Sequence, residues 1–124
     1  MVKPTFEVFR EASVDSAEQL VRVRGELDIT NAKALRGPFR SAVDAGARVV
    51  LLDLSECSRV DSTGLAAILN GARELKLAGV ALVAVTSNSD IVKLFELTAI
   101  GETVPLFPTR DRALAELDGQ PISR

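Results

Sequence analysis

Two largely apolar runs, separated by one long amphipathic segment, set the strongest limit on the fold of this chain. The runs are Val49–Leu54, which contains a single charged residue, and Val80–Val85. Runs of this length are typical of strands that are buried on both faces. Between them, one helical face is formed by Leu65, Ile68, Leu69, Ala72 and Leu75. A helix from Ser62 to about Leu77, placed between two buried strands, predicts parallel strands joined by a crossover and therefore an α/β fold.

The N-terminal part of the chain predicts a different kind of strand pairing. Residues 6–10 and 20–24 alternate apolar and polar side chains, and turn-forming residues lie between them at 14–18. The short connection predicts an antiparallel hairpin. A further short strand is expected at 104–107. The predicted sheet is therefore mixed and mostly parallel, with four to five strands.

Three further helices are predicted from capping residues and from the glycines that follow them. They cover about 31–44, the segment from 89 to before Gly101, and 110–118. Pro38 lies well inside the first and predicts a kink or a break there. The candidate N-caps are Thr30 or Asp28, Ser87 or Ser89, and Thr109. Residues 1–124 are thus predicted to form a single small α/β domain with about four helices and a core at about 5–118.

Composition excludes several classes of function. The chain has no histidine, which rules out histidine bases, catalytic triads and most zinc or iron sites. Cys57 is the only cysteine, and we expect a bystander thiol just after the strand rather than a nucleophile. A net charge of −2 and few aromatic residues give neither the basic face nor the stacking platforms of a nucleic-acid-binding protein. No segment reads as a membrane span or a signal peptide, so a cytoplasmic protein with a protein partner is expected.

Three polar segments lie where predicted strands end and predicted helices begin. They are Glu26–Thr30, Ser58–Gly64 and Ser87–Asp90. Functional loops of open α/β sheets gather beyond the carboxyl ends of the parallel strands. We therefore expect these segments to form one continuous edge of the domain.

Ser62, in the tetrad Asp61-Ser62-Thr63-Gly64, has two interpretations. A serine before a helix is most often an N-cap. Asp61 can take that role itself, which leaves Ser62 in the first turn as a candidate phosphoacceptor, ahead of Thr63 and Ser58. The N–H groups and the dipole of a helix N-terminus tolerate an added phosphate. Phosphorylation is therefore expected to change the docking of a partner and not to unfold the domain.

Glu26 and Asp28 lie two residues apart at a strand end, so their side chains can point to the same side. Paired carboxylates sometimes bind Mg²⁺ or transfer protons, but a capping Asp28 and a solvated Glu26 are the favoured interpretation. The glycines match neither a dinucleotide-binding fingerprint nor a P-loop. No metal, cofactor or catalytic residue is predicted, and the chain is not expected to be an enzyme.

Taken together, these motifs resemble the STAS domain family, and within it the bacterial anti-sigma factor antagonists. The resemblance spans nearly the whole chain. It rests on Gly25-Glu26-Leu27-Asp28, on Val50–Ser55 leading to Val60–Leu65, and on Leu94–Thr98. Two positions depart from the family pattern: Arg59 stands where an apolar or aromatic residue is usual, and Pro38 interrupts the first helix.

The resemblance implies a partner-switching protein. Such a domain binds an anti-sigma factor that is also a serine kinase, which frees the sigma factor. The kinase then phosphorylates the serine of the motif, here Ser62, and the pair dissociates until a serine phosphatase restores binding. The residues expected at the partner interface are Glu26, Asp28, Thr30, Asp61, Ser62, Thr63, Gly64, Ser87 and Asn88.

The family resemblance leaves an alternative open. STAS-like domains also serve as unphosphorylated scaffolds, in lipid-transport or stressosome-type complexes. A third, less favoured interpretation is a small Mg²⁺-dependent enzyme that uses Glu26, Asp28 and Asp61. Members of the family are commonly monomeric when free, and we expect the same here.

Overall fold

The computed structural model describes residues 7–11 and 17–118, which form one five-stranded sheet with helices on both faces. The strands are β1 (Glu7–Glu11), β2 (Glu18–Leu27), β3 (Val49–Val60), β4 (Ala81–Val85) and β5 (Leu106–Phe107). The helices are α1 (Arg36–Asp44), α2 (Ser62–Leu77), α3 (Ser89–Thr98) and α4 (Arg110–Asp118). Two 3₁₀ helices, η1 (Ala32–Leu35) and η2 (Ile100–Glu102), precede α1 and follow α3.

The sheet has the mixed topology that the sequence predicts. Its strand order is β1-β2-β3-β4-β5, so each strand lies beside its neighbour in the chain. β1 and β2 are antiparallel, and the later pairs are parallel. The hairpin is confirmed, whereas most of its expected turn at 14–18 lies outside the described residues.

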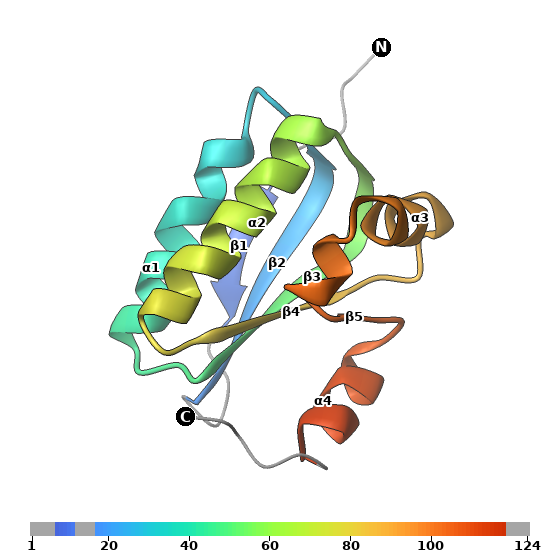
Figure 1. Ribbon diagram of the computed structural model, residues 1–124. Coiled ribbons are helices and arrows are strands. Elements are labelled where there is room, and N and C mark those ends of the chain that lie inside the picture. Colours follow the sequence, from blue (N-terminus) through green and yellow to red (C-terminus); the bar gives the residue numbers. More distant parts are fainter. Residues whose placement is uncertain (1–6, 12–16, 119–124) are drawn as a thin grey trace.

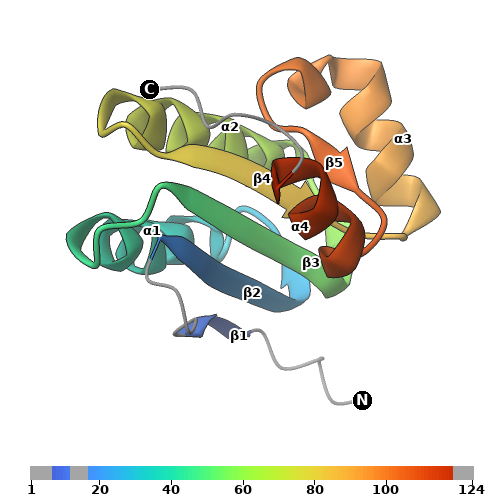
Figure 2. The same cartoon turned by 90° about the horizontal axis from the view of Figure 1, so that it is seen from below.

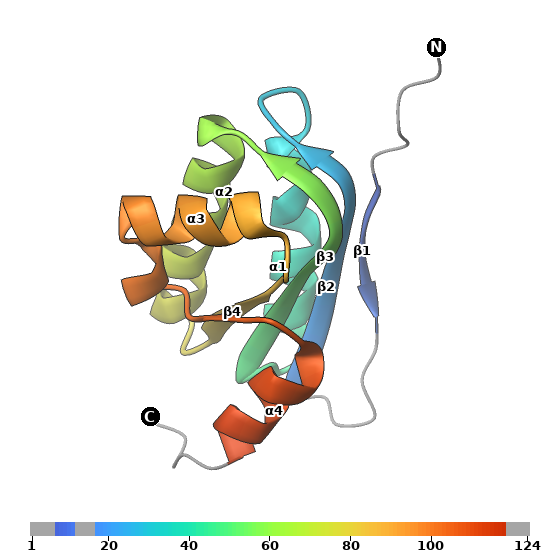
Figure 3. The same cartoon turned by 90° about the vertical axis from the view of Figure 1, so that its right-hand side faces the viewer.

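One face of the sheet carries the main hydrophobic core. Alternate residues of the strands point to it, among them Val21 and Val23 of β2 and Val50 and Leu52 of β3. Helices α1, α2 and α3 cover this face (Figure 3). They contribute Phe39, Ala42, Ile68, Ala72, Leu75, Ile91 and Phe95. The apolar periodicity of α2 is therefore confirmed as its buried face.

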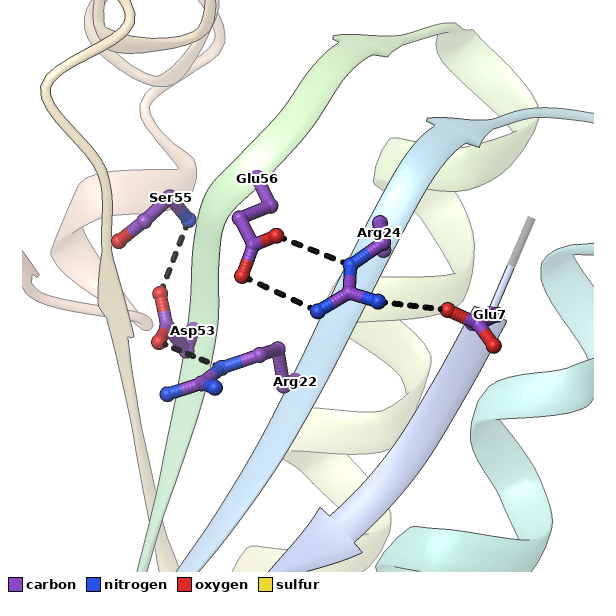
Figure 4. A network of polar contacts seen from close by, with 6 residues as sticks. All are labelled: Glu7, Arg22, Arg24, Asp53, Ser55 and Glu56. Carbon is purple, nitrogen blue, oxygen red and sulfur yellow. Dashed lines mark hydrogen bonds and ion pairs between the residues drawn. The ribbon is translucent and has the colours of Figure 1, made fainter. Parts of the chain in front are cut away.

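The opposite face of the sheet is divided into an apolar part and a charged part. Leu20, Leu51 and Val83 pack there against Ala113 of α4, which crosses this face near β5 (Figure 2). Farther along the same strands the residues become charged. Arg22 Nε donates to Asp53 Oδ2 at 3.1 Å, and Asp53 Oδ1 accepts from the Ser55 amide (Figure 4).

Arg24 joins three strands on this charged part. Its guanidinium contacts Glu56 of β3 at 2.9 Å and Glu7 of β1 at 2.8 Å (Figure 4). The hydrogen bond and charge of Glu56, followed by the charge of Glu7, raise the pKa of Arg24. These exposed pairs are worth little stability singly. They make this part of the face charged rather than apolar.

Two predicted elements differ in their bounds. β3 extends to Val60, so the expected loop at Ser58–Gly64 is reduced to Asp61, between β3 and α2. The predicted helix 31–44 is divided, because η1 ends at Leu35 and α1 begins at Arg36. Pro38 then lies in the first turn of α1, where its missing N–H has no helical partner to lose. The interruption is therefore a change from a 3₁₀ helix to an α-helix between Leu35 and Arg36, and α1 continues through Gly37 and Pro38, where the break was expected.

Candidate functional site

The three polar segments meet at one end of the sheet, at the carboxyl ends of β2 and β3 (Figure 1). We call residues 26–30, 58–64 and 87–90 the rim. The Asp61 amide donates to the Leu27 carbonyl at 3.1 Å, which joins the first two segments. Asn88 Nδ2 donates to the Ser58 carbonyl at 3.4 Å and joins the third. The continuous edge expected from the sequence is therefore present.

The loop after β2 is folded upon itself. The Asp28 carboxylate accepts from the Thr30 amide at 2.9 Å and from the Thr30 hydroxyl. The Asn31 side chain accepts from the Asp28 amide at 2.9 Å and donates to the Glu26 carbonyl at 2.8 Å. The sequence predicted Thr30 or Asp28 as the N-cap of the following helix, and this prediction was wrong. Asn31 holds that position, and the backbone carbonyl of Asp28 takes up the first N–H groups.

Asp61 is the N-cap of α2, as one interpretation of the sequence required. Its backbone is extended, and Oδ1 accepts from the Gly64 amide at 2.8 Å. Ser62 follows as the first residue of α2 and is exposed, whereas Thr63 is half-buried. The hydroxyl of Ser62 is therefore not needed as a cap and is open to another protein.

Gly25, after which the first motif continues with Glu26, and Gly64, which ends the tetrad at the start of α2, are required for different structural reasons. Gly25 has a φ of +96°, which favours glycine, and it lies where the β2–β3 register shifts. Gly64 is buried against the end of β2, and a β-carbon there would lie 2.6 Å from the Leu27 carbonyl oxygen. Gly64 thus allows the first turn of α2 to approach β2. Its part in partner binding stays a prediction.

Cys57 lies inside β3 and not after the strand, because β3 is longer than the sequence suggested. Its side chain is 2% exposed, and its thiol donates to the Arg59 carbonyl at 3.4 Å. Burial raises the pKa of Cys57, against the smaller opposing effect of nearby backbone hydrogen bonds. A thiol held in its protonated form is a poor nucleophile at neutral pH.

In the third segment, the N-cap of α3 is not one of the two serines that the sequence predicts. Asn88 is the N-cap of α3, and its Oδ1 accepts from the amides of Asp90 and Ile91 at 2.9 and 3.2 Å. Ser87 and Ser89 are both exposed and make no such bond. The expected cap at Ser87 or Ser89 was wrong. Thr109, by contrast, accepts from the Arg112 amide at the start of α4, as predicted.

The rim borders two open hollows. One, of about 280 Å³, lies between β3 and α3 and is lined by Ser58, Arg59, Val60, Asp90, Ile91 and Leu94. The other, of about 200 Å³, is lined by Glu26, Asp28, Ile29, Thr30, Arg59 and Asp61. Within residues 7–11 and 17–118, no three acidic, cysteine or histidine side chains are grouped to hold a metal ion. The arrangement suits contact with another macromolecule.

The STAS domain family matches residues 11–113. This range includes every residue of the rim. The chain belongs to the STAS domain family. A Bordetella bronchiseptica protein named as an anti-sigma factor antagonist, BtrV, is 28% identical over 93 residues, which cover 75% of this chain and 80% of that protein.

Solved structures show the same STAS fold. An anti-sigma factor antagonist from Mycobacterium paratuberculosis has a TM-score of 0.74 and 27% identity, over 92% of this chain and 95% of that one. The Bacillus protein SpoIIAA, in its unphosphorylated form, has a TM-score of 0.65 and 21% identity, over 94% of this chain and all of that one. SpoIIAA has also been solved in a phosphorylated form. At that identity the likeness concerns the fold alone.

Two residues after β2 of this STAS domain were not predicted from the sequence: Ile29, within the rim, and Asn31, which directly follows its first segment. Asn31 closes the loop after β2 through its side chain, and an asparagine three residues after Asp28 is a signal for such a turn. Ile29 is 73% exposed, between two polar neighbours. An apolar residue within a polar loop is the only sign of Ile29 in the sequence. Its exposure depends on tertiary contacts, which cannot be predicted from the sequence alone. No helix within the described part of the chain is both long and apolar enough to cross a membrane.

Proposed function

We propose that this chain is an anti-sigma factor antagonist, controlled by phosphorylation of Ser62. Its partner is an anti-sigma factor that is also a serine kinase, and binding releases a sigma factor. The observation that carries the proposal is Ser62 itself, which is exposed at the start of α2 while Asp61 does the capping. The names of the relatives support it. The chain acts in this scheme as a cytoplasmic regulator, monomeric when free and without catalytic activity.

A phosphate on Ser62 suits the helix and disfavours the complex. The first N–H groups of α2 and its dipole favour a negative charge by about 0.3–1 kcal/mol at an exposed site. The modified domain therefore remains folded. In a packed interface, however, the phosphate must lose its water beside the carboxylate of Asp61, the residue that precedes Ser62. The partner is released, and a serine phosphatase reverses the change.

Replacement of Ser62 separates binding from folding. Ser62→Asp is expected to weaken binding to the anti-sigma factor on the order of a hundredfold, because a charge is added at the interface. Its melting temperature should stay within about 3 °C of wild type, because the site is exposed. Ser62→Ala should bind normally. The control is Asn70→Asp, which adds a charge to an exposed position of the same helix.

The partner is obtained by capture from the native lysate on wild-type protein beside Ser62→Asp, and affinities are then measured by calorimetry. Undiminished binding by Ser62→Asp would contradict the switch and favour an unphosphorylated scaffold. Loss of binding by Asn70→Asp as well would show that added charge acts nonspecifically.

The acceptor is tested directly with the captured kinase and ATP. Mass spectrometry should locate one phosphate, on Ser62 and not on Thr63 or Ser58, because Ser62 is exposed and first in the helix. Ser89 holds the corresponding position in α3 and is also exposed. Ser62→Ala should abolish modification, whereas Ser89→Ala should leave it unchanged. The reverse result would reassign the acceptor.

A further inference from the structure

Ile29 is an apolar side chain placed at the centre of a polar site. It is 73% exposed and lines the smaller hollow together with Asp28, Thr30 and Asp61. Single exposed apolar residues are common on protein surfaces. Leu77, at the far end of α2 from Ser62, is 90% exposed and is such a residue. Ile29 differs from Leu77 in its place: it lies on the rim, in the hollow that Asp28 and Asp61 also line, whereas Leu77 lies at the opposite end of α2.

The backbone on both sides of Ile29 is held by hydrogen bonds. Asp28 accepts from the Thr30 amide, and Asn31 spans the loop to the Asp28 amide and the Glu26 carbonyl, at 2.8–2.9 Å. The Ile29 amide itself donates to Asp61 Oδ2 at 3.2 Å. A side chain presented by an ordered backbone loses little conformational entropy when a partner covers it. These features are typical of an anchor residue.

Asp61 connects this segment to the phosphorylation site. Its Oδ1 caps α2 through the Gly64 amide, while its Oδ2 holds the Ile29 amide. The residue next to it is Ser62. One carboxylate thus holds both the backbone of Ile29 and the start of the helix that carries the candidate phosphoacceptor.

We propose that Ile29 is the apolar anchor of the partner interface, inserted into an apolar pocket of the anti-sigma factor, and that Asp61 is the residue that positions it. The inference rests on the proposed function, since the partner is the same protein. It also gives a physical reason for release. Seating Ile29 excludes water close to Asp61 and Ser62, and a phosphate there must be dehydrated for the anchor to stay in place.

Substitution of the anchor tests the proposal by calorimetry with the captured anti-sigma factor kinase. Ile29→Ser should weaken binding at least about tenfold, the loss expected of a buried anchor. Ile29→Leu, which keeps an apolar side chain of similar volume, should recover most of the affinity. Leu77→Ser is the matched control and should bind like wild type, since Leu77 lies away from the rim.

The possible results separate this inference from the proposed function. If Ile29→Ser binds like wild type while Ser62→Asp does not, the anchor is overturned and the switch stands. If the wild-type chain binds no anti-sigma factor, the proposed function falls and the anchor falls with it. Equal losses of affinity in Ile29→Ser and Leu77→Ser would also overturn the anchor, because the loss would then not be specific to a residue of the rim.

The role of Asp61 is tested with Asp61→Asn. The asparagine oxygen can still cap α2, because Asn is as good an N-cap as Asp, but its amide group cannot accept from the Ile29 amide as well. In the free chain, hydrogen exchange by NMR should become faster at Ile29 and stay unchanged at Gly64. In binding, Asp61→Asn and Ile29→Ser should be clearly non-additive in a double-mutant cycle. Additive effects with unchanged exchange at Ile29 would overturn the positioning role.

Discussion

At the scale of a single residue, Cys57 illustrates how burial determines reactivity. Its thiol is 2% exposed and its pKa is raised by that burial. The neutral thiol therefore contributes to the free energy of unfolding. This contribution is fully present below the pKa that Cys57 has in the unfolded chain, and it is lost as pH rises through the higher pKa of Cys57 in the folded chain. We expect iodoacetamide at mildly alkaline pH to modify Cys57 far more slowly in the native protein than in guanidinium. Mass spectrometry gives both rates, and equal rates would contradict the burial.

At the scale of elements, local signals predicted the helices better than the ends of the strands. α2 carries an apolar face, an N-cap and a following glycine, and its predicted bounds agree with the structure. The last part of β3 is polar, and its residues Glu56 and Arg59 are exposed. That part is a strand because it pairs with β2, through contacts such as Arg24 with Glu56. Such pairing is non-local and leaves no periodicity to detect.

The packing of α1 on α2 depends on Gly71. A β-carbon at this position would overlap the ring of Phe39, which is buried between the two helices and the sheet. Gly71→Ala gains about 1 kcal/mol of helix propensity, but overpacking of a core costs about 1–3 kcal/mol. We expect a net loss of stability in urea unfolding. Asn70→Ala, at an exposed position of the same helix, should gain slightly, and a gain by Gly71→Ala would contradict the tight contact.

At the scale of the whole molecule, the sequence predicted the α/β class and the three segments of the rim, because both follow from the order of strands and helices. It did not predict which residues the rim presents. The backbone that presents Ile29 is held by the local turn around Asn31 and by the hydrogen bond to Asp61, which lies 32 positions farther along the chain. Likewise, the charged half of the sheet results from the pairing of Arg22 and Arg24 with acidic residues of a neighbouring strand.

The division of the sheet's second face leads to a prediction about the whole domain. Ala113 of α4 is fully buried against Leu51 and Val83 on the face of the sheet opposite the main core. Ala113→Asp places an unpaired carboxylate in that contact and should lower the free energy of unfolding by about 2–4 kcal/mol. Ala115→Asp, at an exposed position of the same helix, should change it by less than about 0.5 kcal/mol.

Because α4 contributes nothing to the rim, stability and partner binding should separate in these variants. On the proposed function, Ala113→Asp below its lowered melting temperature should bind the proposed anti-sigma factor with near wild-type affinity and should accept phosphate on Ser62 as wild type does. Calorimetry of binding and of unfolding measures the two quantities on the same sample. Loss of affinity in a chain that remains folded would mean that α4 supports the rim through the sheet, and the two faces of the domain would then act as one unit.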